Sequence, residues 1–386
     1  MASLVSSLNR PARQAHRNHQ FDFLRILFAT LVILAHAPEL TDGNNSREIF
    51  SRLTHSNLSF GALGVDGFFL LSGYLIVNSW QKNPELLNFA RNRLLRIIPG
   101  YLVAALLSTV AIGLLAPGID HFFRHLNIHF VKSVLVVSSP STPAVLPGRP
   151  DAQVNGSLWT IQYELRCYVL VAFFGLCGFF RRPSLWLATT ILLLISMVSP
   201  LKTYCHWNES LYPLIGDPSQ IFRLTAVYFV GGCFFLYRHK IQFRPLLACA
   251  AAVALLCVRV FDPSRIELAL VLFGGYLMFY FGQLSIKSLA WMKNVPDISY
   301  GIYVYGWPVL ILWIWYRPHG SPWVAFLVCA VICFGLGLAS WHVIERPALT
   351  LKRRSAVPLP PPQFLLKTAI TAHEEALVSE LPAKLQ

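Results

Sequence analysis

Charged residues are scarce in this sequence. They make up 13% of its 386 residues, whereas hydrophobic residues make up 55% and the mean hydropathy is +0.53. A typical soluble domain has about 25% charged residues, so this composition excludes an ordinary soluble protein and indicates one that lies in a membrane. The formal net charge is +14. In a membrane protein such an excess of lysine and arginine marks cytoplasmic loops, and because no nucleic-acid-binding motif is present we exclude nucleic acid as a partner.

Several catalytic and cofactor-binding motifs are also absent. The sequence has no Walker loop and no dinucleotide-binding fingerprint, and Ser72 follows two leucines and so lacks the first glycine of a G-x-S-x-G motif. The eight cysteines show no CxxC spacing and fall mostly in apolar segments, which is typical of small buried residues and not of a disulfide or zinc framework. No internal repeat is visible, which weighs against a transporter built from inverted repeats.

Ten apolar segments are present, each close to the ~20 residues that a membrane-spanning helix needs. They cover approximately residues 21–39, 60–80, 98–116, 160–180, 184–200, 221–237, 245–260, 266–283, 299–316 and 323–343. We therefore expect an all-α fold, a polytopic membrane helix bundle of about ten transmembrane helices.

Basic residues fall on every second connection between these segments. One set of connections contains Arg91 and then Arg181 and Arg182, whereas the alternate set is mixed or acidic. Because basic residues are enriched in cytoplasmic loops, this alternation predicts that both termini are cytoplasmic. We expect a disordered basic tail over residues 1–20, a membrane domain over residues 21–347, and a flexible proline-rich cytoplasmic tail over residues 348–386.

The first apolar segment contains one arginine, Arg25, and one histidine, His36. On a helix they would be about 16 Å apart and on nearly the same face. Ionisable residues inside a membrane span are costly and usually functional, although Arg25 and His36 could instead reach the two membrane surfaces. The segment also has features of a signal peptide with a cleavage site at Ala35 to Ala37, but Asp22 and the many later segments argue against cleavage.

Two carboxylates are expected at the same depth as His36. Asp66 lies toward the outer end of the second segment, and Glu164 lies at the outer start of the fourth. A carboxylate beside an imidazole fixes its tautomer and raises its basicity, which suits a general base. We therefore predict His36, Glu164 and Asp66 as catalytic residues. The alternative for Glu164 is an ion pair with Arg166 or contact with outer water.

Three arginines are expected together at the cytoplasmic side. Arg93 and Arg96 are three positions apart and so share a helix face, and Arg25 lies at a comparable depth. Guanidinium groups bind phosphates well, so Arg25, Arg93 and Arg96 suit a polyanionic ligand. The alternative is ordinary anchoring of the third segment by positive charge.

The longest outer connection, about residues 117–158, contains His121, His125 and His129 at a spacing of four. On a helix these histidines would share a face and could bind a metal. Phenylalanines interleave with them, however, which favours a helix lying at the membrane interface. We therefore predict no metal site.

Five short blocks occur in order along the chain. They are Arg25 with His36; Gly64, Val65, Phe68, Phe69, Ser72, Gly73 and Tyr74; Arg93, Arg96 and Pro99; Ser157, Leu158, Trp159, Glu164 and Tyr168; and Ser299, Tyr300, Tyr303 and Pro308 followed by residues 344–347. In this order they resemble the integral-membrane acyltransferase family three, which O-acylates surface carbohydrates in bacteria. The resemblance covers most of residues 20–347. One position departs from it, because many members have a histidine where this chain has Gly306.

This resemblance implies transfer of an acyl group, acetyl by analogy, from cytoplasmic acyl-CoA to a hydroxyl of a cell-surface or lipid-linked carbohydrate at the bacterial inner membrane. Arg25, Arg93 and Arg96 would hold the CoA phosphates, and His36 would accept the hydroxyl proton or carry the acyl group itself. Acyl-CoA would be a co-substrate, and no cofactor would be bound permanently.

The same resemblance places the acceptor near aromatic residues, with Trp159, Tyr168 and Tyr74 contacting the sugar. The expected partners are acyl-CoA, the carbohydrate, the lipid bilayer and proteins of polysaccharide assembly. Two other functions remain open. One is a transporter or flippase for a lipid-linked sugar, with Arg25, His36 and Glu164 along its path. The other is a non-catalytic membrane partner of a polysaccharide-assembly complex.

Overall fold

The structure, a computed structural model, describes residues 18–115, 128–140, 153–199 and 216–351, together with positions 123, 126, 142, 145 and 146. These residues form helices and no strand, which confirms the predicted all-α class. Two histidines of the outer connection, His121 and His125, lie outside the described residues, as do the greater parts of both predicted tails.

The α-helices are α2 (His19–Asp42), α3 (Ile49–Leu53), α4 (Phe60–Lys82), α5 (Leu86–Leu115), α7 (Ile128–Leu135), α8 (Ile161–Leu176), α9 (Pro183–Val198), α12 (Pro218–Leu236), α13 (Pro245–Phe261), α14 (Ile266–Ala269), α15 (Gly275–Gln283), α16 (Ser299–Tyr316), α17 (Pro322–Ser340) and α18 (Arg346–Thr350). Short 3-10 segments are η1 (Gly156–Thr160), η2 (Phe179–Arg181), η4 (Pro263–Arg265) and η6 (Lys287–Asn294). Two π-helical segments, η5 (Leu270–Gly274) and η7 (Trp341–Glu345), continue α14 and α17.

Each of the ten apolar segments predicted from the sequence coincides with a helix. Six helices of the described residues are long and apolar enough to cross a membrane, and the number rises to 7 if η6 and α16, bent by 81°, count as one span. Helices α9 and α13 are apolar but shorter. These helices indicate a multi-pass membrane protein. The count of ten transmembrane helices and the cytoplasmic position of both termini stay predictions.

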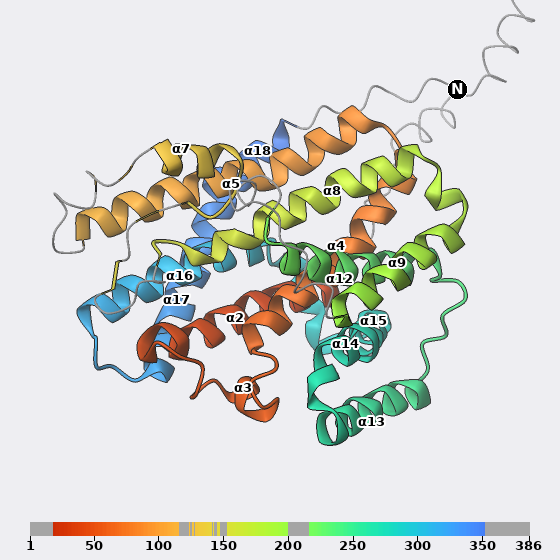
Figure 1. Ribbon diagram of the computed structural model, residues 1–386. Coiled ribbons are helices and arrows are strands. Elements are labelled where there is room, and N and C mark those ends of the chain that lie inside the picture. Colours follow the sequence, from red (N-terminus) through yellow and green to blue (C-terminus); the bar gives the residue numbers. More distant parts are fainter. Residues whose placement is uncertain are drawn as a thin grey trace, which may run out of the picture. The chain divides into compact units, whose positions relative to one another are not determined.

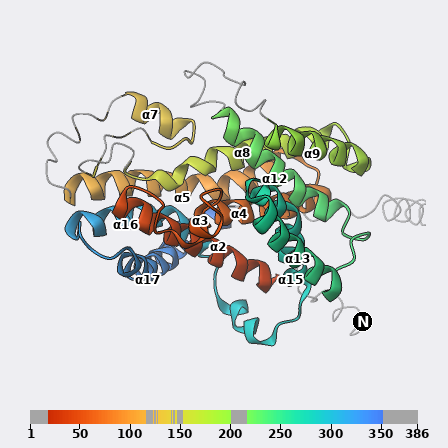
Figure 2. The ribbon, with the colours of Figure 1, turned by 60° about the horizontal axis from the view of Figure 1, so that its bottom comes forward.

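Helix α2 packs against three long helices, α4, α16 and α17 (Figure 1). Helix α4 packs in turn against α12, which lies between α4 and α9 (Figure 2). Helix α7 lies beside α5 in both views, and the buried hydroxyl of Tyr101 on α5 donates a 2.7 Å hydrogen bond to the Ser138 carbonyl just after α7. Helix α2 is therefore enclosed on several sides by other helices.

The helix starts have clear local causes. The Asn18 side chain accepts hydrogen bonds from the Gln20 and Phe21 amides and begins α2, while Gly43 ends it with φ 75°. Proline at the first position begins α9, α12, α13 and α17, where its missing N–H is not needed. Ala35 and Ala37 are only 3% and 0% exposed, so this part of α2 packs inside the bundle.

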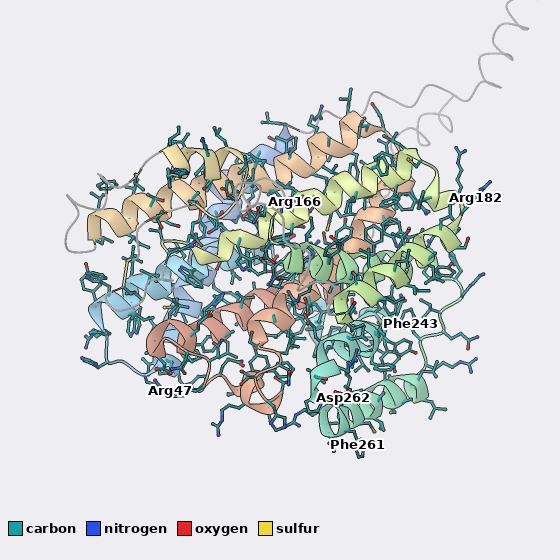
Figure 3. The ribbon with its side chains drawn as sticks, viewed as in Figure 1. Arg47, Arg166, Arg182, Phe243, Phe261 and Asp262 are labelled. Carbon is teal, nitrogen blue, oxygen red and sulfur yellow. The ribbon has the colours of Figure 1, made fainter. Side chains whose placement is uncertain are left out.

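Large apolar side chains cover the outward faces of several helices. On α13, Leu246, Val260 and Phe261 are 78%, 67% and 84% exposed, and Figure 3 shows Phe261 at the free edge of this helix. Arg182, between α8 and α9, projects outward at another edge. Exposed leucine, valine and phenylalanine in such numbers suit contact with lipid tails.

Glycines allow α4 to approach its two neighbours closely. Toward α2, Cβ atoms added to Gly64 and Gly67 would overlap the Phe28 carbonyl and the Phe28 ring. Toward α12, a Cβ on Gly73 would overlap the Tyr228 carbonyl, and one on Gly231 of α12 would overlap the Leu70 carbonyl. Small residues at helix contacts are the usual means of close packing in membranes.

We expect Gly73→Ala to destabilise the protein by about 1–3 kcal/mol, because the added methyl group forces α4 and α12 apart. Gly335→Ala is the matched control, since nothing lies within 4 Å of a Cβ at that exposed position of α17. Thermal unfolding of both purified variants in detergent, followed by tryptophan fluorescence, tests this. Equal melting temperatures for the two variants would show that the close approach contributes little.

Candidate active site

His36 lies in the last third of α2, and its ring has two defined contacts. Its Nδ1 atom is 2.6 Å from Oε2 of Glu39, one helical turn further along. The indole ring of Trp307 on α16 meets the imidazole nearly edge to face, with centroids 4.7 Å apart and planes at 75°. The His36 side chain is 17% exposed. The ring is therefore held on two sides and keeps limited access from outside.

Trp307 is itself held in place by the segment that precedes α8. Its Nε1 donates a 2.7 Å hydrogen bond to the Gln153 carbonyl, and a Cβ on Gly156 would overlap the indole ring. The neighbouring Gly306 faces α2, where an added Cβ would lie 2.8 Å from Cγ1 of Ile33. Many members of acyltransferase family three have a histidine at this position. Its side chain would not fit between α16 and Ile33 of α2.

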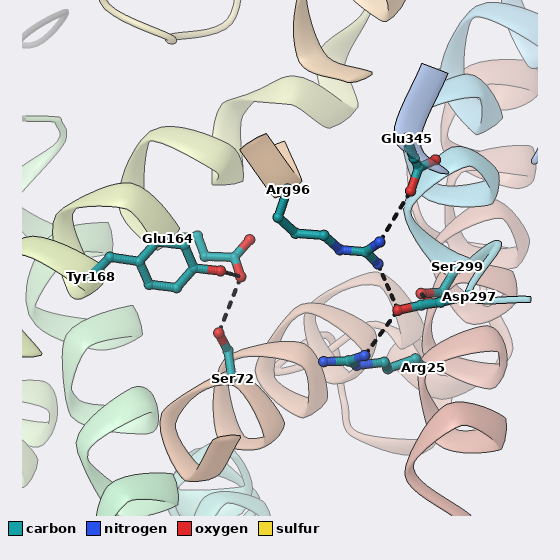
Figure 4. Close-up of polar contacts among 8 residues, drawn as sticks. All are labelled: Arg25, Ser72, Arg96, Glu164, Tyr168, Asp297, Ser299 and Glu345. Carbon is teal, nitrogen blue, oxygen red and sulfur yellow. Dashed lines mark hydrogen bonds and ion pairs between the residues drawn. The ribbon is translucent and has the colours of Figure 1, made fainter. Parts of the chain in front are cut away.

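Glu164 forms a hydrogen-bonded group with two hydroxyls (Figure 4). Its Oε1 accepts a 2.5 Å bond from the Tyr168 hydroxyl and a 3.1 Å bond from Oγ of Ser72 on α4. Figure 4 shows this group to one side of Arg96, with Asp297 on the other side. Glu164 and Tyr168, which was predicted to contact the sugar, therefore belong to one hydrogen-bonded group that includes Ser72 of α4.

The position of Glu164 follows from the path of the segment before α8. This segment enters the bundle before the helix begins, with Asn155 and Ser157 only 3% and 1% exposed. The Asn155 side chain donates to the Val304 carbonyl at 2.9 Å, and Thr160 Oγ1 lies 2.7 Å from the Tyr303 hydroxyl. The first turn of α8 consequently starts inside the protein.

Asp66 belongs to a separate group of charges. Its Oδ1 accepts a 2.7 Å hydrogen bond from Nη2 of Arg223 on α12, and Nε of Arg223 donates to Glu267 on α14. Asp66 is two positions from Gly64, so it lies about 200° around α4 from the face that contacts α2. The structure therefore directs Asp66 toward α12 and does not bring it to His36.

Two of the three predicted arginines meet at one carboxylate (Figure 4). Oδ2 of Asp297 accepts hydrogen bonds from Nη1 of Arg25 at 3.0 Å and from Nη2 of Arg96 at 2.6 Å. Nη1 of Arg96 also lies 3.3 Å from Oε2 of Glu345, whose side chain is 1% exposed. Two positive and two negative charges thus balance where α2, α5, η7 and the start of α16 meet.

Arg93 lies in a different environment. Its Nη2 donates a 2.8 Å hydrogen bond to Oγ of Ser79, and its guanidinium is 5.8 Å from the centroid of the Phe89 ring. Its Nε is buried and has no hydrogen-bond partner in the described part of the chain. Among the three predicted arginines, Arg93 alone has no carboxylate partner within the described residues.

The remaining predicted residues lie apart from His36 in their described contacts. Trp159 is half-buried, and its ring meets Tyr163 edge to face at 5.6 Å. Tyr74 packs in an aromatic cluster that includes Phe21 at the first turn of α2, at 5.8 Å. Tyr74 is therefore near the Arg25 end of α2, although its predicted role in sugar binding places it at the opposite end.

Sequence reasoning missed several of these partners. Glu39 could have been found, because residues three apart share a helix face. Arg223 could also have been found, since it is a charged residue inside an apolar segment, as Arg25 is. Asp297 carries no such signal, because it lies in the connection before α16 and only the fold brings it to Arg25 and Arg96.

Within the described residues, no hydrogen bond joins His36 to Glu164 or Asp66, and no group of three or more His, Cys, Asp or Glu side chains could hold a metal ion. His129 is exposed on α7. The candidate site therefore consists of His36 with Glu39 and Trp307 at one end of α2, and of arginines and carboxylates at the other.

The chain matches a family model described as an acyltransferase domain over residues 18–342. It is 24% identical over 340 residues to the O-acetyl transferase of Shigella phage Sf6, covering 87% of this chain and 97% of that protein. It is 27% identical over 366 residues to nodulation protein 10 of Rhizobium leguminosarum bv. viciae, covering 87% and 94%. It is 26% identical over 344 residues to the peptidoglycan O-acetyltransferase OatA of Listeria monocytogenes, covering 76% of this chain and 52% of that one. No solved structure matches.

We expect the buried Asp66–Arg223 pair to couple α4 to α12 energetically. Asp66→Asn and Arg223→Gln should each lower stability, and the double variant should lose less than the sum, with a coupling of about 0.5–3 kcal/mol. Denaturant unfolding of the four proteins in detergent measures it. The Asp42–Arg47 pair, in which the Arg47 side chain is 50% exposed, is the control cycle and should show a smaller coupling, because solvent screens the arginine. Additive losses at Asp66 and Arg223 would contradict a coupled pair.

Proposed function

The chain belongs to the acyltransferase family whose domain model it matches, and from this we propose that it transfers an acetyl group from cytoplasmic acetyl-CoA to a carbohydrate hydroxyl. The names of the phage and Listeria relatives support acetyl as the group, and the name of the Listeria protein supports a carbohydrate acceptor. The acceptor is a cell-surface or lipid-linked carbohydrate, and the enzyme resides in the bacterial inner membrane.

The observation that carries this proposal is the placement of Arg25 and His36 on one helix, α2, which packs against α4, α16 and α17. The two residues are about 16 Å apart along the helix axis. Arg25 belongs to a cluster of arginines, whereas His36 lies near the other end and is partly exposed. An elongated donor with phosphates at one end and a thioester at the other suits this arrangement.

The reaction assigned to His36 is general base catalysis. The imidazole nitrogen that Glu39 does not hold, Nε2, accepts the proton of the acceptor hydroxyl while the oxygen attacks the thioester carbonyl carbon. The carbon–sulfur bond then breaks, the thiolate takes the proton from the imidazolium, and the products are an acetyl ester and CoA. Transfer through an acetyl-histidine is the alternative route for the same residue.

The donor phosphates require positive charge that is not already neutralised. Arg25 and Arg96 share their charge with Asp297 and Glu345, whereas Arg93 has a hydroxyl and an aromatic ring as its described partners. We therefore assign Arg93 the largest part in phosphate binding, with Arg25 and Arg96 beside it. A transport function gains no support, because Arg25, His36 and Glu164 belong to separate hydrogen-bonded groups in the described residues.

We expect His36→Ala to lower acetyl transfer by roughly 10²–10⁴-fold, the usual contribution of a general base. A host strain that lacks the protein is complemented with wild-type or variant protein, and mass spectrometry of its surface polysaccharide reports the acetyl esters. Membrane insertion and the melting temperature of the variant serve as controls. A folded, inserted His36→Ala protein that still acetylates the polymer rules out this role.

We expect Arg93→Ala to weaken binding of CoA by about 10- to 100-fold, because a charge-assisted hydrogen bond contributes roughly 1.5–3 kcal/mol. Arg182→Ala, which removes an exposed arginine from the connection between α8 and α9, is the matched control and should bind CoA normally. Calorimetric titration of the detergent-solubilised proteins with CoA compares them. Equal affinity of the two variants places the phosphates elsewhere.

A further inference from the structure

Glu39 is the carboxylate that contacts His36 in the described residues. Oε2 of Glu39 lies 2.6 Å from Nδ1 of His36, a short hydrogen bond. The two carboxylates predicted to lie beside His36 have other partners. Glu164 accepts hydrogen bonds from Tyr168 and Ser72. Asp66 accepts one from Arg223. Neither of them therefore holds the imidazole ring.

The local helix geometry explains why Glu39 reaches His36. The two residues are three positions apart, and helical side chains tilt back toward the N-terminus, so the Glu39 side chain covers the turn that contains His36. The backbone of Glu39 is fixed at the same time, because its carbonyl accepts a 2.9 Å hydrogen bond from the amide of Gly43 at the end of α2. The carboxylate thus extends from an anchored helix end.

We propose that Glu39 is the positioning residue for His36, and this inference rests on the proposed acetyl transfer. A carboxylate only accepts hydrogen bonds, so the bond to Glu39 places the proton on Nδ1 of His36. The lone pair of Nε2 is then free for the acceptor hydroxyl. The Trp307 ring, 4.7 Å away at 75°, limits rotation of the imidazole out of this orientation.

Glu39 also acts on the charge that forms during the reaction. When Nε2 takes the hydroxyl proton, His36 becomes a cation in a side chain that is only 17% exposed. The negative charge of Glu39 stabilises that cation, and Glu39 itself neither gains nor loses a proton. The arrangement gives His36 a fixed tautomer before the reaction and a counter-charge during it.

The test compares Glu39→Gln with Asp42→Asn and His36→Gln in one acetyl-transfer assay. Membranes containing each variant receive radiolabelled acetyl-CoA, and label incorporated into the host's surface polysaccharide is measured at varied acetyl-CoA. Glutamine keeps the size of Glu39 but removes its charge and can turn its amide N–H toward Nδ1. Asp42→Asn removes a charge from the same helix end, where Asp42 pairs with Arg47 and not with His36.

We expect Glu39→Gln to lower kcat by at least about tenfold, because it removes part of the roughly 10²–10⁴-fold that a general base contributes. The KM for acetyl-CoA should stay within about twofold of the wild-type value. Asp42→Asn should keep wild-type kcat. NMR spectra of ¹⁵N-histidine-labelled protein report the tautomer, and the His36 signal is assigned by its loss in His36→Gln. The wild type should show the proton on Nδ1. Glu39→Gln should show a shift toward the tautomer with the proton on Nε2.

The outcomes separate this inference from the function on which it rests. An inactive His36→Gln together with a fully active Glu39→Gln overturns the role of Glu39 and leaves His36 as the base. Equal losses of kcat in Glu39→Gln and Asp42→Asn also overturn it, because any negative charge at the helix end would then suffice. An active His36→Gln contradicts the role of His36 as the base, and a wild-type protein that incorporates no label contradicts the proposed function itself.

Discussion

Helix α4 is held between α2 and α12 by glycines on two of its faces, and this close packing sets the directions of the polar residues around it. Gly64 and Gly67 face α2, while Gly73 opposes α12. The contact with α2 fixes the rotation of the helix that carries Arg25 and His36. The same geometry turns Asp66 to the opposite side of α4, where Arg223 of α12 meets it.

The charges inside the bundle tie together helices that are far apart in sequence. Asp297, in the connection before α16, binds arginines from α2 and α5, and Glu345 of η7 joins the same cluster. Taking charges out of water is costly unless they are paired, so each such pair restricts how its helices can be placed. Arg93 stands outside this balance, which leaves positive charge at the end of the bundle where the proposed donor binds.

The two ends of α2 have different chemistry, and the proposed acetyl transfer rests on this difference. The Arg25 end is dense in ionised groups that suit phosphates. The His36 end has one imidazole between a carboxylate and an indole ring. Gly306 belongs to this arrangement, since its lack of a side chain lets α16 approach Ile33 of α2 and brings the adjacent Trp307 to His36.

The sequence by itself determined the all-α class, the positions of the apolar helices and the family, because hydrophobic run length and ordered motif blocks are local properties of the chain. It also brought Arg25 and His36 onto one helix face by spacing alone. Only the tertiary structure decided which groups meet them. Asp297 reaches Arg25 and Arg96 through the packing of distant helices, and Glu164 meets Ser72 of α4 because the segment before α8 enters the bundle. Partners of this kind depend on helix rotation and approach, which side-chain packing sets and no local pattern encodes.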